Sequence, residues 1–340
     1  MGDLVVHELR FLGGPFSNAN IDLVYNGVTP QPLTLEERKS SRRRLQQYCQ
    51  NLLGYTPDYI FTHVTRMVLS KALWRDIRVM EHLDRLLADV GKRAVLFVLS
   101  TSQPAGRRPE WVHAWEAQYG WPVGHRADNG DLLGPEVDFF FSLVEPYNRA
   151  AANSRIVFVN QFGWDRERCG MRMPAEMSFA DIRHGADVEF GQSIYEPFGI
   201  AQVEPLNAGA ISCVSNVCGC VGFVDRVTEA LTKEDQEAGV ADSPWASNPS
   251  LVVADYVSLP AGSGIFTPYE ALGIDRNLRD WVESLRSGDA AWRIFRRLPQ
   301  NDEETAQLLQ AGQTMAQRLS WDVVVRDYFG PGLERARSGA

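Results

Sequence analysis

The stretch that decides the fold reads Tyr195-Glu196-Pro197-Phe198-Gly199-Ile200-Ala201-Gln202-Val203-Glu204-Pro205-Leu206. The apolar-alternating segment before it, residues 186–193, predicts a buried strand. A Pro/Gly turn follows, and then a short helical segment up to Gly209. Strand, tight turn and helix place a helix N-terminus at the carboxyl edge of a parallel sheet. Backbone N–H groups and the helix dipole favour a bound phosphate at that position.

Two glutamates flank the expected phosphate position. Glu196 lies in the turn, and Glu204 follows eight positions later inside the predicted helix. A carboxylate accepts hydrogen bonds from hydroxyl groups, so this spacing offers one acceptor on each side of the phosphate. The arrangement suits a nucleotide-sugar, which has phosphate in the middle and hydroxyl groups at both ends. A plain strand–loop–helix unit with solvated glutamates would explain the fold but not the paired carboxylates.

These residues resemble the E-x7-E signature of retaining glycosyltransferases of the GT-B fold, a group that includes glycogen synthases. The resemblance covers about residues 20–330 and matches only the second, donor-binding domain of that fold. It implies an α/β architecture, a Rossmann-like parallel sheet with helices on both faces, here with insertions. The donor-binding residues that it implies in this stretch are Glu196, Phe198, Gly199, Ile200 and Glu204.

Two cations follow a second predicted strand, residues 58–64, and precede an amphipathic helix. Arg66 and Lys71 stand at the carboxyl end of this strand. Cations at a helix N-terminus oppose the helix dipole and so favour an anion between them, although two plain surface cations are the alternative. In the resembling family an Arg and a Lys at this spacing neutralise the donor diphosphate. The resemblance therefore implies that Arg66 grips the diphosphate bidentately and that Lys71 adds a point charge.

The resemblance also assigns roles to the carboxylates and to a further loop. It implies that Glu204 holds ribose hydroxyls and that Glu196 holds and orients the sugar. It also implies that Glu196, Arg66 and Lys71 are the catalytic residues. Gln161 and Phe162 follow a predicted strand and stand where the family contacts the nucleobase. The alternative for these two is an aromatic loop that only packs.

Composition excludes several classes of protein. A hydrophobic content of 44% and a charged content of 23% are those of a soluble globular chain. The net charge of −9 argues against a general nucleic-acid or membrane binder. No stretch approaches the roughly 20 apolar residues of a membrane span, and the first residues do not form a signal peptide. Five cysteines, an odd number, suggest reduced thiols and a cytoplasmic location.

We expect no metal and no other cofactor. Cys213, Cys218, Cys220 and His184 are the residues that could be considered as ligands. Cys213 lies in a buried strand pattern, and no second Cys/His pair has the spacing of a zinc site. The donor itself, a nucleoside-diphosphate sugar, is then the small molecule that the site needs.

The expected organisation places most of the chain in one domain. Residues 1–20 are an irregular linker or the remnant of an upstream domain, and residues 331–340 are a tail. Residues 21–330 form the donor-binding domain, with elaborations near 101–135 and 225–275. Individual elements expected along it are a strand over 21–25, helices over 35–53 and 136–152, an extra strand over 251–257, and Ser320 as an N-cap beside Trp321 as a core anchor.

The resemblance implies transfer of a hexosyl group from a nucleoside-diphosphate sugar with retention of configuration. A complete enzyme of this fold has an upstream acceptor domain, which we expect in cis or in trans. The isolated chain is then inactive or weakly active. A non-catalytic nucleotide-sugar-binding module with a regulatory or assembly role remains an alternative, because the donor residues are the same in both cases. A sugar-nucleotide epimerase fits the Glu-Pro-Phe-Gly turn less well.

Overall fold

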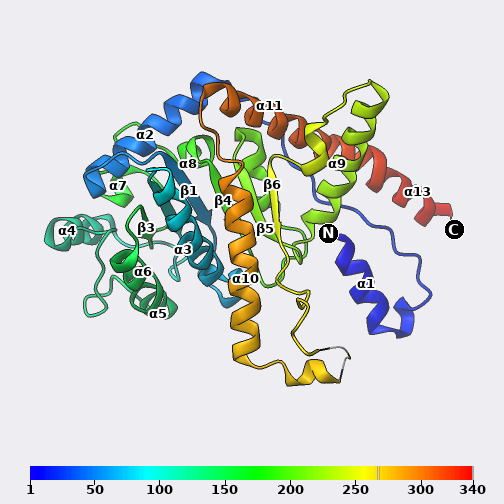
Figure 1. Ribbon diagram of the computed structural model, residues 1–340, viewed down its shortest axis with the longest axis horizontal. Helices are drawn as coiled ribbons and strands as arrows, with labels where there is room; N and C mark the ends of the chain where they lie inside the picture. The colour runs from blue at the N-terminus through cyan, green and yellow to red at the C-terminus, as the bar shows by residue number, and fades with distance from the viewer. Residues whose placement is uncertain (266, 268, 339–340) are drawn as a thin grey trace.

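A sheet of six parallel strands forms the centre of the computed structural model, which describes residues 1–265, 267 and 269–338. The strands are β1 (Tyr59–Val64), β2 (Ala94–Leu99), β3 (Ser154–Val159), β4 (Val188–Gly191), β5 (Ile211–Ser215) and β6 (Leu251–Ala254). Their order across the sheet is β3-β2-β1-β4-β5-β6. Figure 1 shows the sheet in the middle of the molecule with helices around it. The predicted Rossmann-like α/β fold is therefore confirmed.

Apolar cores cover both faces of the sheet, as parallel strands require. On one face Phe61 and Leu96 pack in a core with residues of two long helices. The helices of this face are α3 (Leu73–Asp89), α10 (Arg276–Phe295) and the continuous helical segment made of α5 (Pro135–Phe139), η3 (Phe140–Val144) and α6 (Glu145–Ala150). In Figure 1, α10 crosses in front of the sheet.

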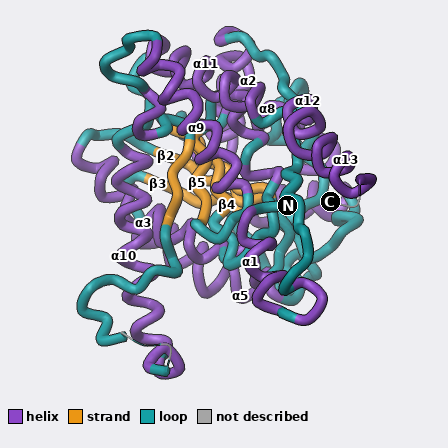
Figure 2. The backbone as a smooth tube through the Cα atoms, turned by 90° about the vertical axis from the view of Figure 1, so that its right-hand side faces the viewer, coloured by secondary structure: helices purple, strands orange, loops and turns teal. Residues whose placement is uncertain are grey.

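The opposite face has two cores side by side. Ile60 and Val95 pack in one of them, and Val214 and Leu251 pack in the other. The main helices of this face are α2 (Leu35–Leu53), α8 (Phe179–Gly185), α9 (Cys220–Glu237) and α11 (Asp302–Arg318). Figure 2 shows the strands in the interior with helices around them, as expected for a sheet that is covered on both faces.

Short elements complete the chain. The remaining α-helices are α1 (Asp3–Leu12), α4 (Pro109–Tyr119), α7 (Arg166–Cys169), α12 (Trp321–Val324) and α13 (Gly330–Ser338). The short turns of helix are η1 (Gly14–Phe16), η2 (Leu69–Lys71), η4 (Ile200–Gln202), η5 (Glu204–Ala208), η6 (Pro244–Ser247), η7 (Glu270–Gly273) and η8 (Val325–Phe329). No helix in the described part of the chain is both long and apolar enough to cross a membrane. The strand expected over 251–257 exists as the shorter β6 at the edge of the sheet.

The N-terminal segment differs from the expectation. Residues 1–20 include the helix α1 rather than being irregular throughout, and residues 21–25 form no strand. Tyr25 instead packs in the core that contains Val214, and its ring stacks on Phe223 at a centroid distance of 4.3 Å. The helix α1 is held by tertiary contacts, since the backbone N–H of Gly2 donates to the Pro197 carbonyl at 2.7 Å. The helices α1 and α13 lie on the same side of the molecule (Figures 1 and 2).

Two further expectations are corrected near the ends of elements. The helix expected over 136–152 runs from Pro135 to Ala150 and contains the π-helical turn η3. Ser320 is the predicted N-cap, with its hydroxyl accepting from Val323 N at 3.4 Å. Trp321 is not a core anchor, because 46% of its surface is exposed. The backbone of Gly27 lies against Trp321 so closely that a Cβ atom there would sit 2.5 Å from the Trp321 nitrogen.

The five cysteine thiols are expected not to react in the folded protein. All five are free and buried, and the sulfur atoms of Cys218 and Cys220 lie 3.3 Å apart. Burial raises the pKa of the Cys49, Cys169 and Cys213 thiols, which disfavours the reactive thiolate. Titration with a chromogenic disulfide reagent should find less than one reactive thiol in buffer and five in guanidinium. Fast reaction of even one thiol in buffer would contradict the packing described here.

Candidate functional site

The predicted site lies where the strand order of the sheet reverses. From β1 the chain continues to β2 and β3 on one side, whereas β4 lies on the other side of β1 and leads to β5 and β6. Loops at the carboxyl ends of β1 and β4 therefore diverge and leave a crevice. This is the usual position of ligands in open α/β sheets. One of these loops carries Lys71, and the other carries Glu196.

Lys71 and Glu196 meet across this crevice although they lie 125 positions apart in the sequence. Lys71 ends the 3-10 turn η2, which joins β1 to α3. Its ammonium group forms an ion pair with the Glu196 carboxylate, and the side chains are only 14% and 21% exposed. A hydrogen bond from Ile194 N to the Ser70 carbonyl, 2.8 Å, joins the same two loops. The structure thus brings together two residues that the sequence placed in one site.

The turn after β4 is fixed by contacts with the loop after β5. Gly219 N donates to the Glu196 carbonyl at 2.9 Å, and Cys220 N donates to the Phe198 carbonyl at 2.7 Å. Gly199 has a φ of 87°, a conformation that favours glycine. A Cβ atom at this position would also lie 2.7 Å from the Cys218 sulfur. Close approach and backbone conformation therefore both require glycine in the Glu-Pro-Phe-Gly turn.

The helix expected after this turn is replaced by two separate 3-10 turns, η4 and η5. Pro205 stands at the second position of η5, and it cannot donate the backbone hydrogen bond that a continuous helix would need. The stabilisation of phosphate by a helix dipole is therefore not available here, because segments of three and five residues have almost no macrodipole. Side chains and single backbone groups must recognise any anion.

Two cavities flank the η4 turn. The larger cavity has a volume of about 540 Å³, and its lining includes Gly27, Phe179, Arg183, Glu204, Asn207 and Trp321. The smaller cavity has a volume of about 200 Å³, and its lining includes His63, Lys71, Glu189, Glu196, Gly199 and Gln202. Ile200 lines both cavities. The two glutamates of the signature thus lie in different cavities on either side of one turn.

Arg183 of α8 lies between the two cavities and contacts a carboxylate of each. Its guanidinium lies 2.5 Å from Glu189 Oε1 and 3.6 Å from Glu204 Oε2. It also donates to the Ala201 carbonyl at 3.1 Å, so it holds the η4 turn from the α8 side. Arg183 therefore interacts with one carboxylate of each cavity and also holds the turn between them.

Glu189 is a buried carboxyl group in the strand β4. Burial raises the pKa of Glu189 to about 7, although Arg183 and His63 act in the opposite direction. The nearby Glu204 carboxylate adds to the increase. Glu189 Oε2 has no hydrogen-bond partner among the described residues. This carboxyl group therefore changes its charge near neutral pH beside the predicted donor site.

The other predicted residues of the signature and of the β1 loop have different environments. Glu204 is 48% exposed at the larger cavity. Phe198 is buried with its ring 6.3 Å from that of Tyr25, so only its backbone faces the turn region. Arg66 is exposed and lines neither cavity. Its predicted contact with a diphosphate would require the side chain to reach over from the rim.

Gln161 and Phe162 are not brought to either cavity. They follow β3, which is separated from β1 by β2. Gln161 Oε1 accepts from Arg107 N at 2.6 Å and Phe162 N at 3.0 Å, and its Nε2 donates to the Arg107 and Arg168 carbonyls at 3.0 and 3.1 Å. All its hydrogen-bonding capacity is thus used within the protein. Phe162 is 57% exposed at this separate position.

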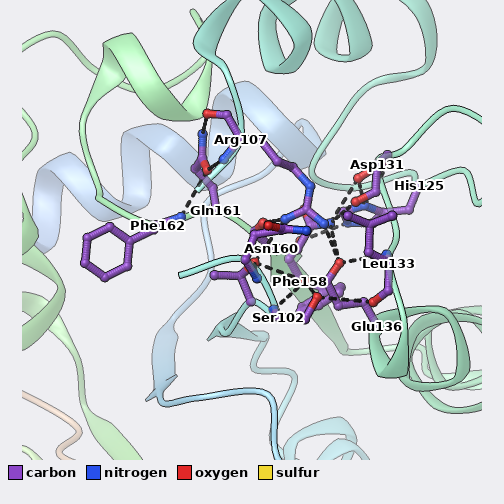
Figure 3. A network of polar contacts seen from close by, with 12 residues as sticks. Ser102, Arg107, His125, Asp131, Leu133, Glu136, Phe158, Asn160, Gln161 and Phe162 are labelled. Atoms are coloured by element: carbon purple, nitrogen blue, oxygen red, sulfur yellow. Dashed lines mark hydrogen bonds and ion pairs between the residues drawn. The ribbon is translucent and has the colours of Figure 1, made fainter. Parts of the chain in front are cut away.

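A buried polar network joins the end of β3 to residues 101–136 (Figure 3). Arg107 forms an ion pair with Glu136, and both side chains are almost fully buried. Asn160 Nδ2 donates to the Asp131 carbonyl at 2.7 Å, and the Asp131 carboxylate lies 3.0 Å from His125 Nδ1. The elaboration over residues 101–135 is therefore fastened to the end of β3 by charged and polar groups. It forms a structural cluster at the edge of the sheet.

Three residues of the site were not predicted from the sequence, namely Arg183, Glu189 and Gln202. Glu189 offers the only usable signal, since it is a charged residue within an apolar strand pattern and such residues are rarely buried unless they have a function or a partner. The Arg183 contact could not be found, because it depends on how α8 packs against the turn.

Comparison with known proteins identifies the fold. No family model and no curated protein sequence matches the chain. Among solved structures, sucrose-phosphate synthase from Thermosynechococcus elongatus is similar over 99% of this chain and 57% of its own, with 16% sequence identity and a TM-score of 0.50. The glycosyltransferase WaaG, involved in lipopolysaccharide biosynthesis, is similar over 94% and 62%, with 14% identity and a TM-score of 0.39. The catalytic domain of starch synthase IV from Arabidopsis thaliana, bound to ADP and acarbose, is similar over 85% and 41%, with 13% identity and a TM-score of 0.41.

The similarity to sucrose-phosphate synthase shows a GT-B fold, and the sheet described above is one Rossmann-like half of it. At 16% identity the likeness to the synthase concerns the fold alone. The chain spans 57% of the length of that synthase.

Proposed function

We propose that this chain is the donor-binding domain of a glycosyltransferase that moves a hexosyl group from a nucleoside-diphosphate sugar to an acceptor, with retention of configuration. The observation that carries the proposal is the pair of cavities on either side of the η4 turn at the strand reversal. Each cavity presents one glutamate of the Glu196/Glu204 pair. A ligand with a polar group at each end and an anion between them fits this arrangement.

The larger cavity suits the nucleoside. Glu204 lines it and accepts hydrogen bonds from ribose hydroxyls, and the rings of Phe179 and Trp321 offer flat surfaces for a base. Exposed aromatic side chains beside an open cavity are a common means of holding a planar ring. This assignment places the base at α8 and Trp321 rather than at Gln161 and Phe162.

The smaller cavity suits the sugar and the leaving phosphate. Lys71 approaches the diphosphate by exchanging the Glu196 carboxylate for a phosphate oxygen, and Arg66 closes over it from the rim. Glu196, released from the lysine, accepts hydrogen bonds from sugar hydroxyls and orients the ring. The two cations stabilise the negative charge that develops on the departing diphosphate, and no metal ion is needed for this.

The acceptor would bind outside this chain. We propose that an upstream domain, in the same chain or in a partner, supplies the acceptor site and closes the crevice. The described domain alone would then bind donor with little or no transfer. Residues 21–330 would be the donor domain in this arrangement, with cytoplasmic nucleotide-sugars as its ligands.

A nucleotide titration tests the donor site directly. We expect one of UDP, ADP or GDP to stabilise the chain, since a ligand at a hundredfold excess over Kd adds about 2.7 kcal/mol to the free energy of unfolding. For a chain of this size the midpoint temperature should rise by about 4 °C. Lys71→Ala removes a charge-assisted contact worth about 1.5–3 kcal/mol and should weaken nucleotide binding at least about tenfold.

Lys233→Ala is the matched control for that titration, because the Lys233 side chain is 77% exposed and distant in sequence from the site. It should bind the nucleotide with unchanged affinity. If none of the three nucleotides stabilises the wild-type chain in calorimetry or thermal melting, the proposed donor site is wrong.

A further inference from the structure

Two buried side-chain oxygen atoms of the smaller cavity have no hydrogen-bond partner within the described part of the chain. They are Glu189 Oε2 and Gln202 Oε1, and neither finds a donor among the residues that the structure describes. The two side chains are only 4% and 7% exposed. Leaving a buried acceptor unpaired costs about 1–3 kcal/mol, and more when the group is charged. Two such groups in one small cavity indicate that its occupant supplies hydrogen-bond donors.

The strands around Glu189 are also more polar than a buried parallel sheet requires. Thr62 of β1 and Ser212 of β5 are the direct cross-strand neighbours of Glu189, so the three side chains lie on one face of the sheet. All three are buried, and the Ser212 hydroxyl has no acceptor or donor among the described residues. Apolar residues would give this face a better core. Glu189 is the member of this polar row that lines the smaller cavity.

The charges facing Glu189 make the floor of the cavity a poor place for phosphate. Arg183 of α8 pairs with Glu189, Glu204 of η5 lies beyond that arginine, and His63 of β1 is held by the Asp76 carboxylate at 2.5 Å. Across the cavity, Lys71 is paired with Glu196. Both cations beside the floor, Arg183 and Lys71, are thus already paired with a carboxylate. A hydroxyl-rich, uncharged group fits this floor better than an anion.

We propose that Glu189 and Gln202 determine which sugar the donor site accepts, by accepting hydrogen bonds from hydroxyl groups of the transferred hexosyl residue. The proposal rests on the proposed donor-binding function and adds two residues outside the glutamate pair of the signature. Gln202 lies over the backbone of Gly191, where any larger residue would collide with its side chain. Its amide is therefore held above the same strand that carries Glu189.

This arrangement gives the sugar subsite its selectivity. A site built around buried acceptors rejects an analogue that lacks the matching hydroxyl, because the acceptors then stay unpaired. The nucleotide part of the donor does not reach these groups in the proposed arrangement. Changes at Glu189 and Gln202 should therefore alter the contribution of the sugar and leave that of the nucleotide intact.

The test compares a nucleoside diphosphate with its hexose conjugate by calorimetric titration. UDP, ADP and GDP and their glucose and mannose conjugates are the probes, and the bare nucleotide is the internal control for each variant. In the wild-type chain we expect the matching conjugate to bind at least about tenfold more tightly than the bare nucleotide, as one hydrogen bond to a charged group allows. In Gln202→Met this gain should fall to about threefold or less, with the affinity for the bare nucleotide unchanged. In Glu189→Gln the gain should fall to the same extent.

Each other result overturns a defined part of the argument. A full hexosyl gain in both variants would overturn the role of Glu189 and Gln202 while leaving the donor site in place. An equal loss of affinity for nucleotide and conjugate in folded variants would assign these residues to phosphate binding and would also overturn it. A wild-type chain that binds none of the probes would overturn the proposed function and this inference with it.

Discussion

Replacing Glu136 by alanine should lower the free energy of unfolding by about 3–5 kcal/mol, the usual effect of removing one partner from a buried ion pair. Glu136 is fully buried and pairs with Arg107. Its carboxylate also accepts from Ser102 N at 2.7 Å and Leu133 N at 3.0 Å. The substitution leaves a buried guanidinium and several backbone donors without an acceptor (Figure 3). Guanidinium unfolding followed by tryptophan fluorescence measures the loss.

Glu145→Ala provides the matched control in the same helical segment. The Glu145 side chain pairs with Arg149 at the surface, one helical turn away. Such a pair contributes at most about 0.5 kcal/mol, so this variant should unfold close to the wild type. If Glu136→Ala proves as stable as Glu145→Ala, the network does not fasten residues 101–135 to the sheet.

The sheet could be predicted because its strands have a local signal. Segments such as β2 are apolar throughout and end at turn residues, so the sequence alone indicates a strand covered on both faces. Residues 21–25 have a similar composition and form no strand, since pairing depends on which strands have a free edge nearby. The exposed Trp321 shows the same limit, because composition cannot tell a core tryptophan from one at the rim of a cavity.

The site could be predicted only in part, for a related reason. The signature predicted Glu196 as a site residue, and the position of Lys71 after a strand predicted the lysine. Both strands end at the same edge of the sheet, so the two side chains meet there. Parallel strands end at one edge of the sheet, but the sequence does not give the order of strands. Gln161 was expected near the nucleotide from the resemblance, and in the structure it follows β3, which is separated from β1 by β2. Arg183 could not be predicted, because its contacts with Glu189 and Glu204 depend on how α8 packs against the η4 turn.

Raising the pH should destabilise the wild-type chain relative to Glu189→Gln. Burial raises the pKa of Glu189 from 4.5 to about 7, so the folded protein holds this proton more tightly than the unfolded chain does. The resulting stabilisation is fully present below pH 4.5 and is lost progressively as the pH rises to 7. A tenfold change in an equilibrium constant corresponds to about 1.4 kcal/mol, so the loss across this window amounts to about 3 kcal/mol.

The difference between the two chains isolates this group, because every other titrating residue is common to both. The unfolding free energies of wild type and Glu189→Gln should be measured in parallel between pH 4.5 and 7. The difference between them should change in one direction as the pH rises. The wild type falls relative to the variant up to pH 7, and the difference is constant above it. A difference that stays constant throughout would mean that Glu189 is ionised in the folded protein at all these pH values. The Arg183 ion pair would then outweigh the cost of burial, and the cavity floor would hold a permanent carboxylate for the sugar hydroxyls.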